Sequence, residues 1–235
     1  MAHMSERASE IAAGLAEVRQ RIDVAARAAG RRDRVGLVVV TKTFPPTDVE
    51  ILGGLGVRDV AENRDQEARG KHAEAAADGV RWHMIGQLQR NKANSVAQWA
   101  DVVESIDRPE IAVALGRAAV AAGRTLDALV QVALDPVVRP GRGGVDPASA
   151  IDLAAVVAHE PGLRLCGVMG VAPYPGDPDE AFERLAAVGA AVAARWDRAK
   201  VISAGMSGDL EQAIAHGATQ VRVGGAILGA RPPVQ

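Results

Sequence analysis

Short apolar runs alternate with amphipathic stretches along most of the 235-residue chain. Each of these runs except the last is followed by a stretch with helical periodicity, and a long alanine-rich helix, 5–29, is predicted before the first. Uniformly apolar strands with helices between them are typical of a parallel sheet that helices cover. The runs predict eight strands: 35–42, 57–63, 82–86, 101–107, 128–134, 163–171, 200–206 and 220–227.

Eight strand–helix units in a chain of this length predict an α/β fold, a single (β/α)8 TIM barrel with an extra N-terminal helix; such barrels have about 250 residues. The alternative is an open, doubly wound sheet, which a G-x-G-x-x-G motif after the first strand would favour. The sequence at that point is TKTFPPTDVE and contains no glycine. The barrel is therefore the better prediction, and its functional residues are expected at the C-terminal ends of the strands.

Composition and charge exclude several classes of function. A net charge of −2 and 3% aromatic residues argue against a nucleic-acid partner. The longest apolar stretch, 185–194, is too short to cross a membrane, and the chain has no signal peptide, so we expect a cytoplasmic protein. We also expect a monomer. Cys166 is the only cysteine and is predicted to be a buried structural thiol. Residues 1–4 resemble an expression scar, which leaves 5–235 as one domain.

Lys42 is the first candidate for chemistry, because it ends an apolar strand. Lysine is rare in this chain, which uses arginine for most of its 27 basic residues. A lysine can lose its proton and attack a carbonyl group, which a guanidinium cannot do. The alternative is that Lys42 extends its ammonium group to solvent.

Other polar residues end later strands, and each has a structural alternative. His83, beside Trp82, also fits a hydrogen-bonded core histidine, and Asn63 also fits the start of a helix. Ser207 lies in a turn of small residues that precedes a helix. That turn is either an N-cap, with Asp209 and Gln212 at capping-box spacing, or an anion site.

The glycines after the last strand complete a possible phosphate site. Gly224 and Gly225 would let the backbone close around a phosphate, and barrels commonly bind phosphate in the loops after strands seven and eight. With Lys42 on the same rim, the pair suits a ligand that carries both a phosphate and an aldehyde. Pyridoxal 5′-phosphate (PLP) is such a ligand, and Arg222 could then donate a hydrogen bond to its ring nitrogen.

Four segments carry a family resemblance: VVVTKTFPP (38–46), AENRDQEARGK (61–71), WHMIGQLQRNKA (82–93) and the closing block 202–231. Together they resemble the pyridoxal phosphate homeostasis protein family, whose single-domain barrels are similar to the N-terminal domain of alanine racemase. The resemblance implies that Lys42 carries PLP as a Schiff base. It further implies cofactor-binding roles for Asn63, His83, Ser207, Arg222, Gly224 and Gly225.

The chain also departs from the family pattern. Ala204 stands where the family usually has methionine, and Gly225 stands where it commonly has threonine or serine, which removes one hydroxyl contact to phosphate. The segment 131–145 differs from the family's strand and lysine-glycine loop, and could accommodate a different partner or a second ligand. Lys92 is expected to be a surface residue, although a second PLP contact is the alternative.

Three functions remain open. The resemblance implies a non-catalytic PLP carrier that buffers the cofactor or delivers it to PLP-dependent apoenzymes. A PLP-dependent amino-acid racemase is the second interpretation, and a Schiff-base aldolase is the third. Racemisation needs acid–base groups on both faces of the cofactor. Only residues 228–235 follow the last strand, so we expect no second domain to complete such a site, and Tyr174 is the one tyrosine that could act there.

Overall fold

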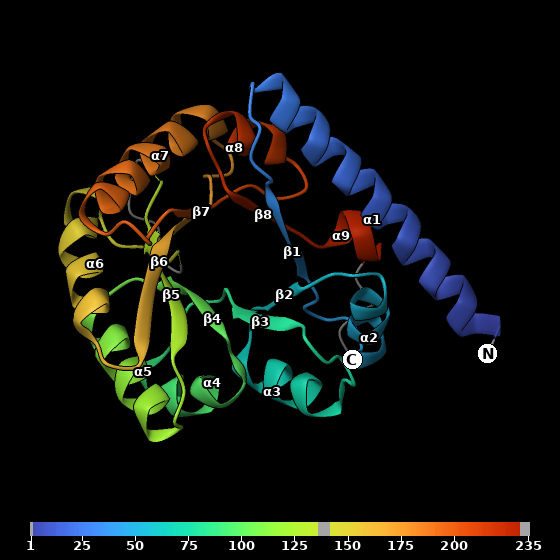
Figure 1. Cartoon of the computed structure of the whole chain (residues 1–235), viewed down its shortest axis with the longest axis horizontal. Helices are drawn as coiled ribbons and strands as arrows, with labels where there is room; N and C mark the ends of the chain where they lie inside the picture. The colour runs from blue at the N-terminus through green and yellow to red at the C-terminus, as the bar shows by residue number, and fades with distance from the viewer. Residues whose placement is uncertain (1, 136–141, 231–235) are drawn as a thin grey trace.

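The computed structural model describes residues 2–135 and 142–230. Over these residues eight parallel strands close into a barrel in chain order, with β8 pairing back to β1 (Figure 1). The predicted TIM barrel and its N-terminal helix are confirmed. The strands are β1 (Gly36–Val40), β2 (Asp59–Glu62), β3 (Arg81–Met84), β4 (Val102–Ile106), β5 (Leu126–Val132), β6 (Leu163–Gly170), β7 (Val201–Ser203) and β8 (Gln220–Val223).

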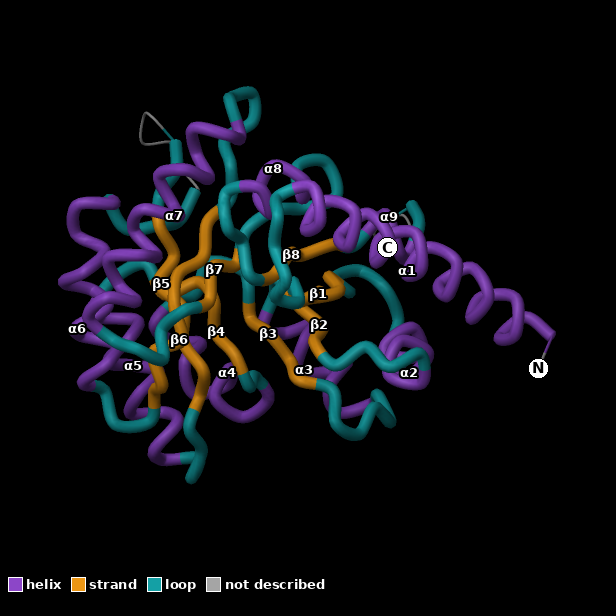
Figure 2. The backbone as a smooth tube through the Cα atoms, turned by 45° about the horizontal axis from the view of Figure 1, so that its top comes forward, coloured by secondary structure: helices purple, strands orange, loops and turns teal. Residues whose placement is uncertain are grey.

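Helices surround the barrel and cover the outer face of its strands (Figure 2). The long helix α1 (Ala2–Ala28) lies outside this ring, alongside the last two helices of the chain. The other helices are α2 (Pro46–Gly54), α3 (Asp65–Glu74), η1 (Arg90–Lys92), α4 (Ala93–Trp99), α5 (Pro109–Ala121), η2 (Pro147–Ser149), α6 (Ala150–His159), α7 (Pro178–Arg195), α8 (Leu210–Ala215) and α9 (Gly225–Leu228). Within the described residues, no helix combines the length and apolar character needed to span a membrane.

The structure differs from the sequence predictions in several places. Strands β1 and β7 end at Val40 and Ser203, before the predicted ends at 42 and 206, so Lys42 follows its strand and does not end it. A short helix, α9, follows β8, where none was predicted. Helix α1 begins at Ala2 and not at Ser5, because no glycine or proline interrupts the helix before that point. Cys166 is partly exposed, so the prediction of a buried thiol is wrong. It lies in the first half of β6, where buried and more exposed positions alternate with the two-residue period of a strand.

The hydrophobic core lies between the strands and the helices, and α5 shows how the sequence builds it. Pro109 begins the helix at a position where its missing N–H is not needed. Ile111 and Leu115, four residues apart, share one helical face and are fully buried. Val120 lies on another face and is 57% exposed. The helix is therefore held by its apolar stripe against the barrel.

We predict that Leu115→Ala lowers the free energy of unfolding by about 2–5 kcal/mol, because it leaves a cavity in a closely packed interface. Val120→Ala removes apolar atoms from the same helix at an exposed position, and should change the free energy by no more than about 0.5 kcal/mol. Urea unfolding of both variants measures the two values. Equal values would show that α5 does not pack as described.

Candidate functional site

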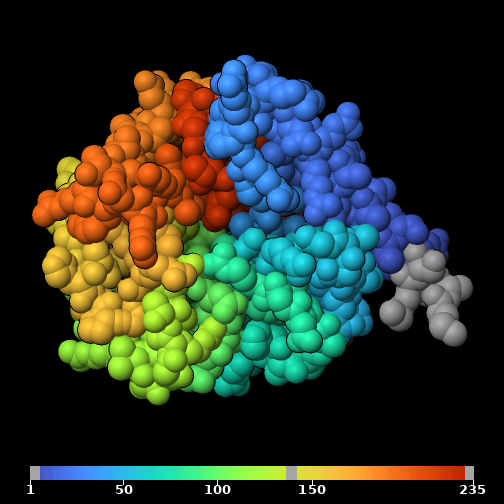
Figure 3. Space-filling model, in the orientation of Figure 1, coloured from blue at the N-terminus to red at the C-terminus, as the bar shows by residue number. Residues whose placement is uncertain are grey.

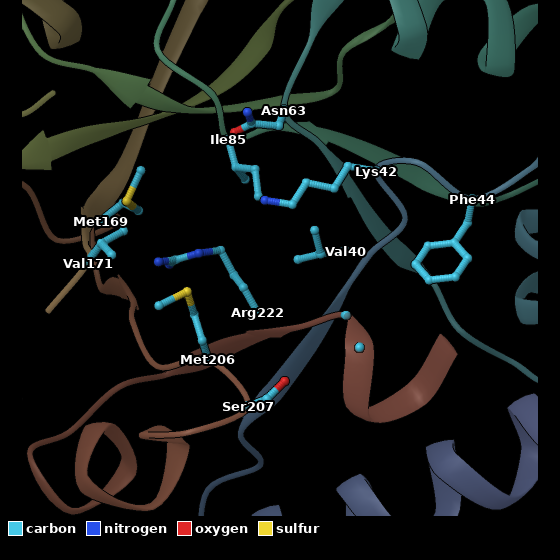
Figure 4. A pocket seen from close by; sticks show the side chains of 12 residues that line it. Val40, Lys42, Phe44, Asn63, Ile85, Met169, Val171, Met206, Ser207 and Arg222 are labelled. Carbon is cyan, nitrogen blue, oxygen red and sulfur yellow. The ribbon is translucent and has the colours of Figure 1, made fainter. Parts of the chain in front are cut away.

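A cavity of about 310 Å³ opens at the C-terminal ends of the strands (Figure 4). Its volume lies at the lower end of the range for small-molecule sites. Among the described residues that line it, two carry positive charge and none carries a carboxylate, so the cavity suits an anionic ligand. The lining residues are Val40, Lys42, Phe44, Asn63, Ile85, Met169, Val171, Met206, Ser207, Arg222, Gly224 and Gly225. Six of the seven residues predicted from the sequence are therefore brought together, and His83 is not.

Lys42 follows the end of β1 and extends its side chain across the cavity toward Ile85 (Figure 4). The next residue, Thr43, has a φ of 70°. A β-branched residue rarely adopts this left-handed conformation, which costs about 1–3 kcal/mol. The backbone therefore turns sharply, directly after the lysine, and something in the surrounding structure must hold it there.

A buried cluster of charged side chains holds this turn. The Lys71 ammonium group donates to the Thr41 carbonyl oxygen at 2.7 Å and to the Glu62 carboxylate at 2.6 Å. Lys71 also contacts the Glu67 carboxylate at 3.2 Å, and that carboxylate accepts from the Thr43 backbone N–H at 2.5 Å. Burial raises the pKa of Glu62, and its contacts with Lys71 and Thr41 oppose that shift. The residues on both sides of Lys42 are thus fixed by one cluster.

Sequence reasoning missed this cluster, although a signal was present. Lys71 is another of the rare lysines, and it lies four residues after Glu67 on α3. That spacing predicts a helical ion pair, but not that the pair is buried beneath the end of another strand.

Asn63, in the loop after β2, is held at the cavity by close packing against Gly86, in the loop after β3. A Cβ atom added at Gly86 would lie 2.0 Å from the Asn63 backbone oxygen. Only glycine permits this approach. The two loops therefore hold each other, and Asn63 lines the cavity beside Ile85.

Arg222 enters the cavity from β8 and is almost fully buried, with 3% of its surface exposed. Its guanidinium group donates to the Ser203 hydroxyl at 2.6 Å and to the Gly170 carbonyl oxygen at 2.8 Å. The Ser203 hydroxyl donates in turn to Glu104 at 2.6 Å. Burial lowers the pKa of Arg222, and the negative charge of Glu104 opposes this. The side chain is therefore held in one orientation by buried partners.

His83 lies below the cavity, inside the barrel. Its ring hydrogen-bonds Glu104 at 2.7 Å through Nδ1 and Asp59 at 3.0 Å through Nε2. Side chains alternate along a strand and fill a barrel in layers, so the inward position two residues later, Ile85, reaches the cavity instead. The expectation that His83 lines the cavity is thus corrected. His83 is the hydrogen-bonded core histidine that the sequence also allowed. His83 acts on the site only through Glu104, which supports Arg222.

The turn after β7 presents Ser207 to the cavity. The Met206 backbone N–H donates to the Asp209 carboxylate at 2.6 Å, which folds the turn back on itself. Asp209 is the N-cap residue of α8, but its side chain makes no capping hydrogen bond to that helix, so the predicted capping box does not form.

Two further predictions concern residues outside the cavity. Lys92 is exposed in η1, which confirms that it is a surface residue. The departing segment 131–145 lies partly outside the described residues. In its described part, the Gln131 side chain donates to the Gly143 carbonyl oxygen at 2.9 Å.

Comparisons with known proteins agree with this fold and site. The family model of the alanine racemase N-terminal domain matches residues 14–232, which gives the class of barrel. The pyridoxal phosphate homeostasis protein of Mycobacterium tuberculosis is 47% identical, over 96% of this chain and 95% of its own length. The protein of that name from Escherichia coli is 36% identical, over 95% of this chain and 97% of its own length. The chain belongs to the pyridoxal phosphate homeostasis protein family, as its sequence motifs predicted.

A solved structure extends the comparison to a bound ligand. PipY of Synechococcus elongatus, determined with PLP bound, matches with a TM-score of 0.79 and 30% identity. The match covers 93% of this chain and 100% of PipY.

We predict that His83 titrates above the ordinary histidine value of about 6.5. Burial alone would lower its pKa, but the hydrogen bonds to Asp59 and Glu104 raise it. The stability that His83 contributes is therefore fully present below its unfolded-state pKa and is lost as the pH rises through the folded-state pKa. His72 is the internal control, because burial lowers its pKa. NMR titration of both imidazole rings measures the two values, and a His83 value below that of His72 would contradict the described network.

Proposed function

We propose that this protein binds PLP in the cavity, with the Lys42 amine and the PLP aldehyde joined in a Schiff base. It takes part in PLP homeostasis in the cytoplasm, by buffering the cofactor or delivering it to PLP-dependent apoenzymes, without catalysis of its own. One observation carries the proposal. One cavity has the Lys42 amine, just after β1, on one side and the Ser207 turn and glycine loop on the other, and none of its described lining residues carries a carboxylate.

The residues present fit PLP at each end of the cavity. Lys42 supplies the amine, and Asn63 lies beside it (Figure 4). On the other side, Ser207 supplies a hydroxyl, and Gly225 begins α9, whose first N–H groups have no acceptor within the helix. Gly224 must be glycine for packing, because an added Cβ atom would lie 2.9 Å from the Val40 backbone oxygen, and its backbone lines the cavity. These groups would hold the phosphate.

Arg222 bears on whether the bound cofactor is active. PLP supplies an aldehyde that reacts with amines and a pyridine ring that withdraws electrons. An arginine that faces the ring nitrogen keeps its own proton and leaves that nitrogen unprotonated. The ring is then a weaker electron sink. The fixed orientation of Arg222, held by Ser203 and Gly170, supports this role.

The carrier fits the cavity better than the racemase does. Racemisation needs an acid–base group on each face of the cofactor. Tyr174, the candidate for the second group, is 89% exposed and does not line the cavity. Among the described lining residues, Lys42 is the only ordinary acid–base group, since arginine does not titrate near neutral pH. The same lysine and phosphate groups would also suit a sugar-phosphate aldolase, but the relatives that this chain matches favour PLP.

We predict that Lys42→Ala abolishes the visible absorption band that PLP gives on forming a Schiff base, because no other described lysine lines the cavity. Lys92→Ala removes an exposed lysine and is the matched control, which should keep the band. Absorption spectra with and without added PLP measure both. Circular dichroism shows whether the variants are folded.

Two outcomes of this experiment would contradict the proposal. A band that persists in folded Lys42→Ala would place the Schiff base on another residue. Racemisation of alanine or serine by the wild type, lost in Tyr174→Phe, would show that the protein is a racemase and not a carrier.

We predict that Ser207→Ala weakens PLP binding by about 1–3 kcal/mol, because it removes a hydrogen bond to the phosphate in a partly buried site. Gly225→Ser is the reciprocal test. A Cβ atom there meets nothing within 4 Å, so an added hydroxyl can reach the same phosphate and should tighten binding. Equilibrium titration with PLP measures both. Unchanged affinity in both variants would show that the phosphate lies elsewhere.

A further inference from the structure

Helix α1 packs across the two elements that would hold the phosphate. Its buried stripe faces α8 and α9, which follow β7 and β8. Figure 1 shows α1 running beside α9, and in Figure 3 blue N-terminal residues border red C-terminal ones. The stripe consists of Ile11, Leu15, Val18, Ile22 and Ala25.

Arg21 connects α1 directly to the turn that carries Ser207. Its guanidinium group donates to the Ser207 backbone oxygen at 2.9 Å. It also makes two hydrogen bonds to the Glu211 carboxylate, at 2.8 and 2.9 Å. Because Glu211 lies in the first turn of α8, this fork fixes the turn and the helix after it together. The hydrogen bond to Arg21 lowers the pKa of Glu211, which keeps the pair charged.

Gly14 and Arg7 connect α1 to the glycine loop at the other half of the phosphate site. A Cβ atom at Gly14 would lie 2.8 Å from the Ile227 oxygen and 2.9 Å from the Ala226 oxygen. Both oxygens belong to α9, so this helix rests directly on the α1 backbone. Arg7 donates to the Leu228 oxygen at 3.0 Å, at the end of α9.

We propose that α1 is a positioning element for the phosphate end of the PLP site, and that Arg21 and Gly14 determine how firmly the cofactor is retained. Neither residue lines the cavity. Arg21 acts through the Ser207 carbonyl group, and Gly14 acts through the position of α9. The inference rests on the proposed function. It adds that displacing α1 weakens the hold on the phosphate and leaves the Lys42 end of the site unchanged.

Comparing the affinities for two ligands distinguishes this positioning role from a general loss of protein stability. PLP has both the phosphate and the aldehyde, whereas pyridoxal has the aldehyde alone. We expect Arg21→Gln to weaken PLP binding about 2- to 10-fold, because it removes the partly buried hydrogen bond to the Ser207 carbonyl group together with the two to Glu211. Pyridoxal binding should stay unchanged. Gly14→Ala, which pushes α9 outward, should act in the same direction. Arg27→Gln makes the same charge change at an exposed position of α1 and should leave both affinities unchanged.

The outcomes distinguish this inference from the function on which it rests. A ratio of PLP to pyridoxal affinity that falls in Arg21→Gln and stays constant in Arg27→Gln would support the role of α1. If the wild type prefers PLP but Arg21→Gln leaves the affinity ratio unchanged, including by an equal loss for both ligands, the inference is overturned. A wild type that binds pyridoxal as tightly as PLP, or binds neither, would overturn the proposed phosphate site and this inference with it.

Discussion

The pairing of β1 with β8 is the constraint on which the site depends. It places Val38 opposite Arg222 and Val39 opposite Val223, although these residues are far apart in the sequence. Each strand then ends at the same rim, so Lys42 and the glycines after β8 meet across one cavity. An open sheet with the same strands would leave the amine and the glycine loop at opposite edges. Closure of the barrel therefore makes a two-ended ligand site from two separate motifs.

Buried charges then fix what the closure brings together. The cluster around Lys71 holds the strained turn on both sides of Lys42, and the cluster around Glu104 orients Arg222. Buried ionic groups contribute little net stability, but separating the partners leaves an uncompensated buried charge, so such clusters allow little movement of the groups they join. Both clusters contact residues at the cavity or next to them in the chain, so they serve its arrangement as well as the stability of the fold.

The sequence predicted the barrel because each strand and helix has a clear periodicity, and it predicted the strand-end residues because barrels expose those ends. It could not decide the depth of an inward residue. His83 in β3 and Ile85 just after it are two residues apart and share the inward side, and only three-dimensional packing shows which of them reaches the cavity. Nor could it show that Lys71 is buried beneath Lys42, or that α1 contacts the Ser207 turn, because these contacts join distant segments.

The most direct test of the account is to reduce the PLP-loaded protein with borohydride and map the modified peptide by mass spectrometry. The chain offers few alternatives, since its lysines are Lys42, Lys71, Lys92 and Lys200. The account predicts a single adduct, on Lys42. An adduct on another lysine, or none with PLP in excess and the protein folded, would contradict it.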